Sequence, residues 1–326
     1  MLQMITVQRW LVSALAISII FFWLGLLHRE SYKSVLTSYR SICSVLTPSS
    51  TEELEYRTEE EDYDLDNSNK YALGSEFMKF KAKKSPIRLL CLVITQPKAF
   101  NTTFGRVRAI NDTWGSRCTF LYFVSSESTV VETGYHVLHN PVKENYGSIW
   151  SKTKLGFKFA FKNHIQQVDW VMKTDDDTYV IMENLHEMLS RHDPDKPAYF
   201  GSHLNFHVKQ GYMSGGSGYI LSRKAVELLV TSAFPNQTLC RGADKDSGFE
   251  DLELGICLQN VGVKPTSSRD LKRDEETFFP MNFWKMMTAN NKSWITGVLA
   301  KKPKEFQGFE CCSEHAISFH YINPEK

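Results

Sequence analysis

Three consecutive carboxylates, Asp175, Asp176 and Asp177, are the residues of this chain best suited to chemistry. They follow the apolar run 168–172, which is typical of a buried strand, and open α/β sheets bind ligands at the carboxyl ends of such strands. Adjacent carboxylates repel one another, and a divalent cation relieves that repulsion while also binding phosphate oxygens. The pattern therefore predicts a metal site that holds a diphosphate. A solvated acidic loop is the competing interpretation.

The elements that must position these carboxylates alternate along residues 86–326. Apolar runs predict strands at 88–95, 120–124, 168–172, 199–200 and 218–221. Helical patterns lie around 107–114, 149–165, 185–189, 225–229 and 249–259, and Ser222 is positioned to cap the fourth. This alternation predicts an α/β sandwich with a mostly parallel central sheet. Neither a P-loop nor a G-x-G-x-x-G motif follows the first strand, so the metal is expected to bind the phosphates.

The amino-terminal region predicts a membrane anchor. The chain has 326 residues and a formal net charge of +1, which gives no electrostatic preference for nucleic acid, and no such partner is expected. Residues 10–27 are apolar apart from two serines and a glycine, and their length is at the short end of what spans a bilayer. The run meets charged residues without a small-residue cleavage site, which favours an uncleaved anchor over a signal peptide.

The segments after the anchor indicate a lumenal body. N-glycosylation sequons begin at Asn101, Asn111, Asn236 and Asn291. Six of the seven cysteines also lie in the body, which suits an oxidising compartment. Residues 52–66 carry nine acidic side chains and one arginine, a composition that does not order itself. We therefore expect a cytosolic tail at 1–9, an anchor at 10–27, a lumenal stem at 28–85 and a catalytic domain at 86–326.

Five sequence blocks in the body carry a family resemblance. They are R-A-I-N-D-T-W at 108–114, W-V-M-K-T-D-D-D-T-Y-V at 170–180, K-Q-G-Y-M-S-G-G-S-G-Y at 209–219, E-D-L at 250–252, and C-C-S with S-F-H-Y between 311 and 321. Together they resemble the core 1 β1,3-galactosyltransferases, within the inverting β1,3-glycosyltransferases, over nearly all of 87–322. The resemblance implies a GT-A type nucleotide-sugar fold in a single-pass type II membrane protein of the Golgi or secretory pathway.

The resemblance also implies a reaction. Galactose would pass from UDP-galactose to the 3-hydroxyl of GalNAc on a serine or threonine of a glycoprotein acceptor, with inversion at the anomeric carbon. Such a displacement needs a base at the acceptor hydroxyl and charge stabilisation on the departing UDP. Mn²⁺ is the implied cofactor, with Asp175, Asp177 and His320 as ligands, because mixed oxygen and imidazole ligation suits manganese better than calcium. Taken alone, His320 would be interpreted as a structural histidine.

Asp251 is the implied base, and Glu250 is the alternative, because adjacent helix positions point in different directions. Without the resemblance, an acidic pair at a helix start is explained by its favourable interaction with the helix dipole. The family positions near the nucleotide sugar are Thr95, Tyr146, Lys152 and Asp176. An exposed helix lysine is the competing interpretation of Lys152.

The candidates on the acceptor side are Tyr212, Gly215, Gly216 and Trp284. The glycines would let the backbone approach the sugars closely, and the aromatic rings would stack on sugar faces. A flexible turn and ordinary core aromatics are the competing interpretations.

The six body cysteines allow fifteen disulfide pairings. The resemblance implies three bonds, Cys91–Cys118, Cys240–Cys257 and Cys311–Cys312. Buried free thiols are the competing interpretation of Cys91 and Cys257. A homodimer is a further expectation from the family.

One departure leaves the acceptor open. Residues 279–309 lack the dense Trp/Tyr cluster that the family places before its paired cysteines. A related β1,3-hexosyltransferase with a different acceptor is therefore one alternative function. A non-catalytic, chaperone-like relative that binds client enzymes is another, although such relatives lack the aspartate motif, which is intact here.

Overall fold

The computed structural model describes residues 86–100, 105–126, 134–289, 294–301 and 311–324. The expected tail, anchor and stem lie outside these residues. Within the described part of the chain, no helix is long and apolar enough to cross a membrane.

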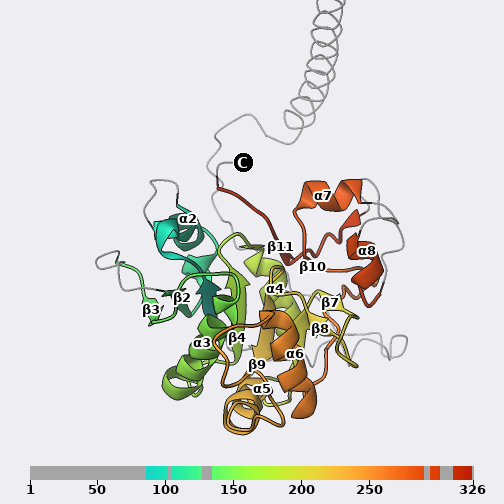
Figure 1. Ribbon diagram of the computed structural model, residues 1–326. Coiled ribbons are helices and arrows are strands. Elements are labelled where there is room, and N and C mark those ends of the chain that lie inside the picture. Colours follow the sequence, from blue (N-terminus) through green and yellow to red (C-terminus); the bar gives the residue numbers. More distant parts are fainter. Residues whose placement is uncertain (1–85, 101–104, 127–133, 290–293, 302–310, 325–326) are drawn as a thin grey trace, which may run out of the picture. The chain divides into compact units, whose positions relative to one another are not determined.

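A six-stranded mixed sheet forms the centre of the body (Figure 1). Its strands, in spatial order, are β3 (Val137–Asn140), β2 (Phe120–Ser126), β1 (Leu89–Ile94), β4 (Trp170–Asp175), β9 (Tyr219–Ser222) and β6 (Tyr199–Gly201). The first four are parallel to one another, whereas β9 is antiparallel to both β4 and β6. The expected α/β architecture with a mostly parallel sheet is confirmed.

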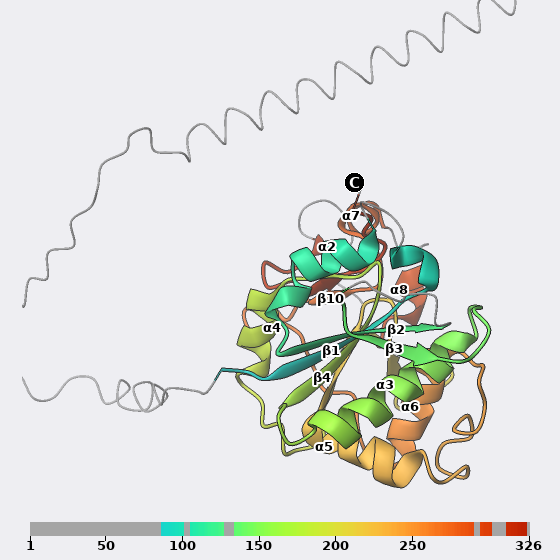
Figure 2. The same ribbon diagram turned by 90° about the vertical axis from the view of Figure 1, so that its left-hand side faces the viewer.

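Helices cover both faces of this sheet (Figures 1 and 2). On one face lie α3 (Ser148–His164), α5 (Arg223–Leu228) and α6 (Glu250–Asn260), and on the other lie α2 (Arg106–Asp112) and α4 (Met182–Leu189). Successive strand side chains point to opposite faces. Leu90 and Leu92 of β1 accordingly belong to the core beneath α3, while Leu89 and Val93 belong to the core beneath α2 and α4. Burial on both faces explains why β1 is apolar throughout.

The helix boundaries follow local signals. The Ser222 hydroxyl accepts a hydrogen bond from the backbone N–H of Ala225 at 3.1 Å, so the predicted cap of α5 is confirmed. Short 3-10 turns lie at Pro97–Phe100 and Gly115–Arg117, and a π-helical turn, Leu229–Ala233, extends α5.

A second, three-stranded sheet was not predicted from the sequence. It consists of β10 (Phe278–Phe279), β11 (Ser318–Phe319) and β5 (Tyr179–Val180), with β11 parallel to β10 and antiparallel to β5. Because β5 begins two residues after the aspartates, this pairing brings the C-terminal segment beside them. The remaining elements are β7 (His203–Leu204), β8 (Tyr212–Met213), α7 (Phe283–Thr288) and α8 (Trp294–Val298).

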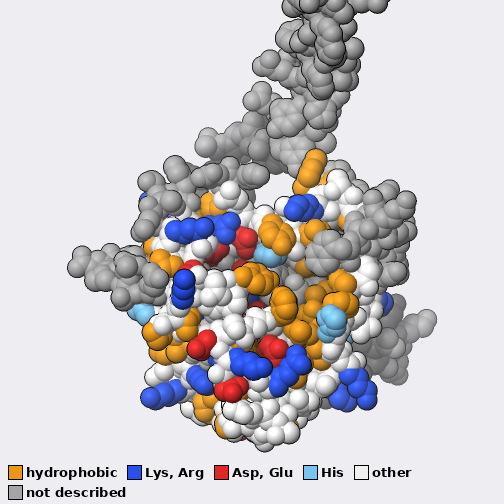
Figure 3. Space-filling view, in the orientation of Figure 1, with side chains coloured by type: hydrophobic (Ala, Val, Ile, Leu, Met, Phe, Trp, Pro, Cys, Tyr) orange, Lys and Arg blue, Asp and Glu red, His pale blue; other side chains and the backbone are white. Residues whose placement is uncertain are grey.

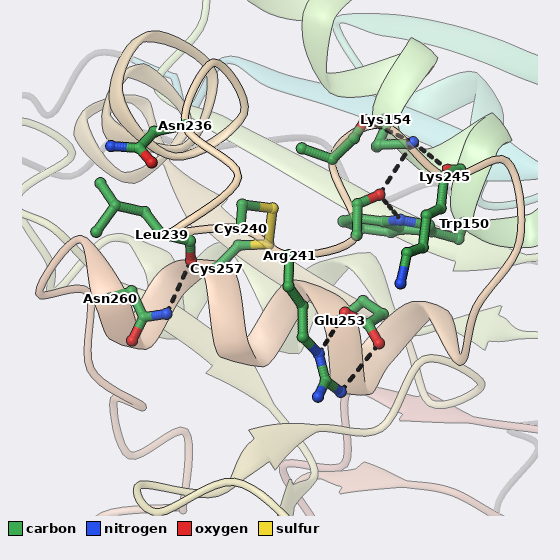
Figure 4. The surroundings of a disulfide bond; sticks show 12 residues. Trp150, Lys154, Asn236, Leu239, Cys240, Arg241, Lys245, Glu253, Cys257 and Asn260 are labelled. Carbon is green, nitrogen blue, oxygen red and sulfur yellow. Dashed lines mark hydrogen bonds and ion pairs between the residues drawn. A yellow bond between two sulfur atoms is a disulfide. The ribbon is translucent and has the colours of Figure 1, made fainter.

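All three implied disulfides are present: Cys91–Cys118, Cys240–Cys257 and Cys311–Cys312. The interpretation of Cys91 and Cys257 as free thiols is therefore wrong. Cys240–Cys257 ties the segment that precedes α6 to the helix itself (Figure 4).

Two of the four predicted glycosylation sites lie within the described residues. Asn111 is on α2, and its side-chain amide donates to the Asp112 carboxylate at 3.1 Å. Asn236 (Figure 4) is exposed. Its side-chain oxygen accepts the backbone N–H of Thr238 at 2.9 Å. Asn101 and Asn291 lie outside the described residues. Occupancy of each site stays a prediction.

Candidate active site

A cavity of about 630 Å³ opens at the carboxyl ends of β1 and β4. Acidic side chains and a histidine lie together in a hollow of the face shown in Figure 3. Most of the predicted site residues line the cavity: Thr95, Tyr146, Lys152, Asp175, Asp176, Asp177, Gly215, Gly216, Glu250, Asp251 and His320. The fold therefore brings into one place residues that are far apart in the sequence.

Asp175, Asp177 and His320 form a compact donor set. Each offers one ligand atom, and these atoms lie within 4.8 Å of one another. The Nε2 atom of His320 is 3.1 Å from Asp177 Oδ1 and 3.9 Å from Asp175 Oδ2. Ligands about 2.1 Å from an octahedral ion are about 3 Å apart when adjacent, so these separations fit a single divalent ion. Two carboxylates and an imidazole also suit manganese chemically.

The backbone around His320 orients its ring. The Nδ1 atom is 3.3 Å from the Pro280 carbonyl oxygen, and donation through Nδ1 leaves the lone pair of Nε2 facing the carboxylates. Gly216 packs directly against the ring, because a Cβ atom there would be 2.1 Å from His320 Cε1. A flexible turn does not account for this contact, which requires the absence of a side chain.

Asp176 and Asp177 differ in their partners. Asp176 accepts hydrogen bonds from the Thr95 hydroxyl and from Arg106, both at 2.7 Å. Burial raises the pKa of Asp176, and these bonds offset that effect only in part. Burial also acts to raise the pKa of Asp177, but its contacts with His320 and Arg106 outweigh that effect, so this pKa is lowered.

Arg106 and Glu144 are site residues that the sequence did not reveal. The Arg106 guanidinium on α2 lies 3.7 Å from Asp177 Oδ2, in addition to its contact with Asp176. Glu144 pairs with the ammonium of Lys152 at 2.9 Å, and the same ammonium donates to the Thr95 carbonyl at 2.9 Å. The Lys152 side chain is 2% exposed, so its interpretation as an exposed helix lysine is wrong.

The two candidate bases occupy different environments in the first turn of α6. Asp251 accepts backbone N–H groups from Gly215 at 3.0 Å and from Leu252 at 2.9 Å, and a carboxylate retains further lone pairs. Burial raises the pKa of Asp251. Both oxygens of Glu250 are bonded inside the protein, one to Lys173 and the other to the Tyr219 hydroxyl. Asp251 is therefore better placed than Glu250 to accept a proton from a ligand.

Lys173 is a third residue that sequence reasoning missed. Its side chain is 1% exposed, and its ammonium lies 2.8 Å from Asp175 Oδ1 and 3.1 Å from Glu250 Oε2. The signal was available, because a lysine inside an otherwise apolar strand must be paired when it is buried. The sequence alone does not identify its partners.

Two predicted acceptor residues do not line the cavity as the structure describes it. Tyr212 is 8% exposed and packs in a small core with Leu204 and Ile295, and burial raises its pKa to about 12. Trp284 is on α7 and is 71% exposed. Their role in acceptor binding stays a prediction.

Comparison with known proteins identifies related sequences. The Fringe-like family model matches residues 92–288. Glycoprotein-N-acetylgalactosamine 3-beta-galactosyltransferase 1 of Xenopus laevis is 35% identical over 242 residues, which cover 73% of this chain and 64% of that relative. Beta-1,3-glucosyltransferase of Mus musculus is 24% identical over 182 residues, which cover 55% of this chain and 35% of the relative.

Among solved structures, a Drosophila β-galactosyltransferase in complex with manganese, UDP-Gal and xylobiose covers 57% of this chain, with a TM-score of 0.33 and 14% identity. The match covers 67% of that chain.

The resemblance to the core 1 galactosyltransferases is confirmed by the identity with the Xenopus protein. The chain matches that relative over slightly less than two thirds of its length. The family model, in contrast, covers more than half of this chain. The chain belongs to the Fringe-like family.

Proposed function

We propose that this chain is an inverting, metal-dependent β1,3-galactosyltransferase with a GT-A type fold. It transfers galactose from UDP-galactose to the 3-hydroxyl of GalNAc linked to serine or threonine of a glycoprotein. The catalytic domain is lumenal in the Golgi or secretory pathway, and an anchor at 10–27 attaches it to the membrane.

One observation carries this proposal. A donor set for a divalent ion, Asp175, Asp177 and His320, lines the same cavity as the half-buried carboxylate of Asp251. A volume of about 630 Å³ lies within the range of small-molecule sites. Transfer of a sugar from a nucleotide to a hydroxyl requires two parts, a metal-ligand set and a separate base, within one cavity.

The residues of the cavity have distinct roles in this proposal. Asp251 accepts the proton of the acceptor 3-hydroxyl as that oxygen forms a bond to the anomeric carbon, and the bond from that carbon to UDP breaks on the opposite side. The bonds from Gly215 and Leu252 orient the Asp251 carboxylate. Arg106 adds positive charge beside the aspartates, near the expected diphosphate.

Asp175, Asp177 and His320 would hold Mn²⁺. When bound, the ion supplies charge stabilisation for the departing diphosphate. Asp176 has another role in this proposal: its two oxygens are held by Thr95 and Arg106, so it fixes α2 against the carboxyl end of β1.

Tyr212 and Trp284, the predicted acceptor residues, do not line the described cavity. This observation favours one second candidate, a β1,3-hexosyltransferase that uses a different acceptor.

The full chain, produced in a secretory host and solubilised in detergent, provides the test. UDP release is measured with UDP-galactose and Mn²⁺, in the presence and absence of a GalNAc-threonine peptide. We expect release that depends on the peptide and is abolished by EDTA. Slow release that is independent of the peptide would favour the second candidate. The absence of nucleotide binding would contradict both candidates and favour the chaperone-like alternative.

A further inference from the structure

Lys173 is enclosed by acceptors from three different elements. It lies on β4 two residues before Asp175, and residues so spaced on a strand share a face of the sheet. Its ammonium has three protons, and three acceptor atoms surround it: Asp175 Oδ1 at 2.8 Å, Glu250 Oε2 at 3.1 Å and the Gly215 carbonyl at 3.3 Å. One buried cation therefore joins β4, the loop before β9 and the start of α6.

The contact with Asp175 determines which oxygen of that carboxylate is free. Lys173 holds Oδ1, whereas Oδ2 is the atom measured 3.9 Å from His320 Nε2. Groups that bond to the second oxygen of a ligating carboxylate fix its orientation toward a metal. Lys173 thus presents one defined oxygen of Asp175 to the predicted ion.

Gly215 links Lys173 to the predicted base, Asp251, because it is hydrogen-bonded to both. The Gly215 carbonyl accepts from Lys173, and the Gly215 N–H donates to Asp251 Oδ2 at 3.0 Å. Packing here leaves no room for a side chain, because a Cβ on Gly215 would be 2.6 Å from Glu250 Oε2 and 3.4 Å from Lys173 Nζ. A displacement of the Lys173 ammonium would therefore be transmitted to Gly215 and Asp251.

We propose that Lys173 is a positioning residue that couples the predicted metal site to the predicted base. Its ammonium holds Asp175 in the orientation that binds the ion, and it holds Gly215 where that residue orients Asp251. Loss of the ammonium weakens metal binding and proton transfer together. The identity of the base in this proposal rests on the proposed function.

A simpler role is that Lys173 only neutralises the buried charge of Glu250. The test must separate this role from positioning, and Lys173→Met alone leaves Glu250 unpaired and can prevent folding. The informative comparison is therefore Lys173→Met/Glu250→Gln against Glu250→Gln. In the double variant no buried charge is left unpaired at position 250, while the contacts to Asp175 and Gly215 are lost.

Lys154 provides a matched control. It is also a buried lysine, and its ammonium donates to the carbonyls of Gly242 and Ala243 at 3.3 and 2.9 Å (Figure 4). None of these three residues lines the cavity. Lys154→Met therefore removes a buried ammonium without touching the predicted metal set.

Two quantities are measured on the full-length proteins: Mn²⁺ affinity in the presence of UDP, from the electron paramagnetic resonance of the ion, and kcat at saturating Mn²⁺. We expect the double variant to melt near Glu250→Gln, with both Mn²⁺ affinity and kcat about 10- to 100-fold below those of Glu250→Gln. Lys154→Met should retain the wild-type Mn²⁺ affinity.

Recovery of both quantities to the Glu250→Gln values in the double variant would show that Lys173 is only a counter-ion and would overturn the proposal. If the double variant has a lower Mn²⁺ affinity than Glu250→Gln but the same kcat, Lys173 does not couple the metal site to the base, and the proposal is overturned. Mn²⁺ binding is measured without turnover. A wild-type chain that binds Mn²⁺ but transfers no galactose would therefore contradict the proposed function, while the comparison of Mn²⁺ affinities between the variants would still test the role of Lys173 at the metal site.

Discussion

Asp251 and Glu250 are adjacent in sequence, and only their surroundings distinguish them. The partners of Asp251 are backbone N–H groups at the edge of the cavity, whereas the two carboxylate oxygens of Glu250 are hydrogen-bonded to Lys173 and Tyr219. At the scale of single residues, the hydrogen-bond partners therefore decide which of the two carboxylates is assigned as the base.

Asp251→Asn removes the proton acceptor while keeping a similar shape. We expect kcat to fall by about 10²- to 10⁴-fold, the usual contribution of a general base, while UDP still binds. Single-turnover kinetics and calorimetry with UDP measure the two effects. Turnover retained in this variant would move the role of base to Glu250.

Glu276 gives the stability of the fold a pH dependence. It is almost buried, and burial outweighs the nearby charge of Arg269 and raises its pKa from 4.5 to about 7. Because the pKa is higher in the folded than in the unfolded state, protonation of Glu276 stabilises the fold. This contribution is complete below pH 4.5 and is lost as the pH rises through about 7.

We therefore expect the melting temperature of the wild type to fall between pH 5.5 and pH 8 by more than that of Glu276→Gln. Thermal unfolding followed by circular dichroism across this range measures the difference. Parallel curves for the two proteins would show that Glu276 does not titrate there.

At the scale of elements, the turn between β8 and β9 is built around the absence of side chains. Gly216→Ala would place a Cβ 2.1 Å from Cε1 of His320 and displace that predicted ligand. We expect Mn²⁺ affinity to fall by about 10-fold or more. Gly297→Ala on α8 is the control, because no atom of the described residues lies within 4 Å of a Cβ at that position. Equal Mn²⁺ affinity in the two variants would contradict the inferred contact.

The sequence predicted the elements that carry a repeating pattern. Strand β1 and helix α3 were found because each contains enough residues to show apolar continuity or a helical face. Strands β5, β10 and β11 have two residues each, too few for any period. Their pairing also joins Val180 to Ser318, a partner that local sequence does not specify.

The same distinction applies to the site. Asp175 to Asp177 were found because three acids after an apolar run are a local signal, and His320 and Asp251 were found through motifs. Arg106 was missed because its partner Asp176 lies 70 residues away, and Glu250, one of the partners of Lys173, lies 77 residues away. The family block at 108–114 includes Arg108, which pairs with Asp112 on the surface, and not Arg106, which pairs with Asp176.

At the scale of the whole molecule, a disulfide and an ion pair hold the segment that leads into Asp251 against α6. The segment from Cys240 to Phe249 leads into Asp251, and the disulfide to Cys257 fixes its start (Figure 4). Arg241 pairs with Glu253 along the same segment.

Cys240→Ser/Cys257→Ser should lower the free energy of unfolding by about 2–4 kcal/mol, the usual contribution of a disulfide. Urea unfolding of the double variant and the wild type under non-reducing conditions measures this loss. Identical unfolding midpoints would show that the bond does not stabilise the fold.

The antiparallel pairing of β5 with β11 has a consequence for the order in which the predicted metal site is synthesised. About 140 residues separate Asp177 from His320. At a synthesis rate of about 5–20 residues per second, the ribosome makes the acidic triplet roughly 7–30 s before the imidazole. A nascent chain therefore carries the aspartates without the predicted third ligand, His320, during this interval. A chain truncated before β11 would lack the complete predicted ligand set.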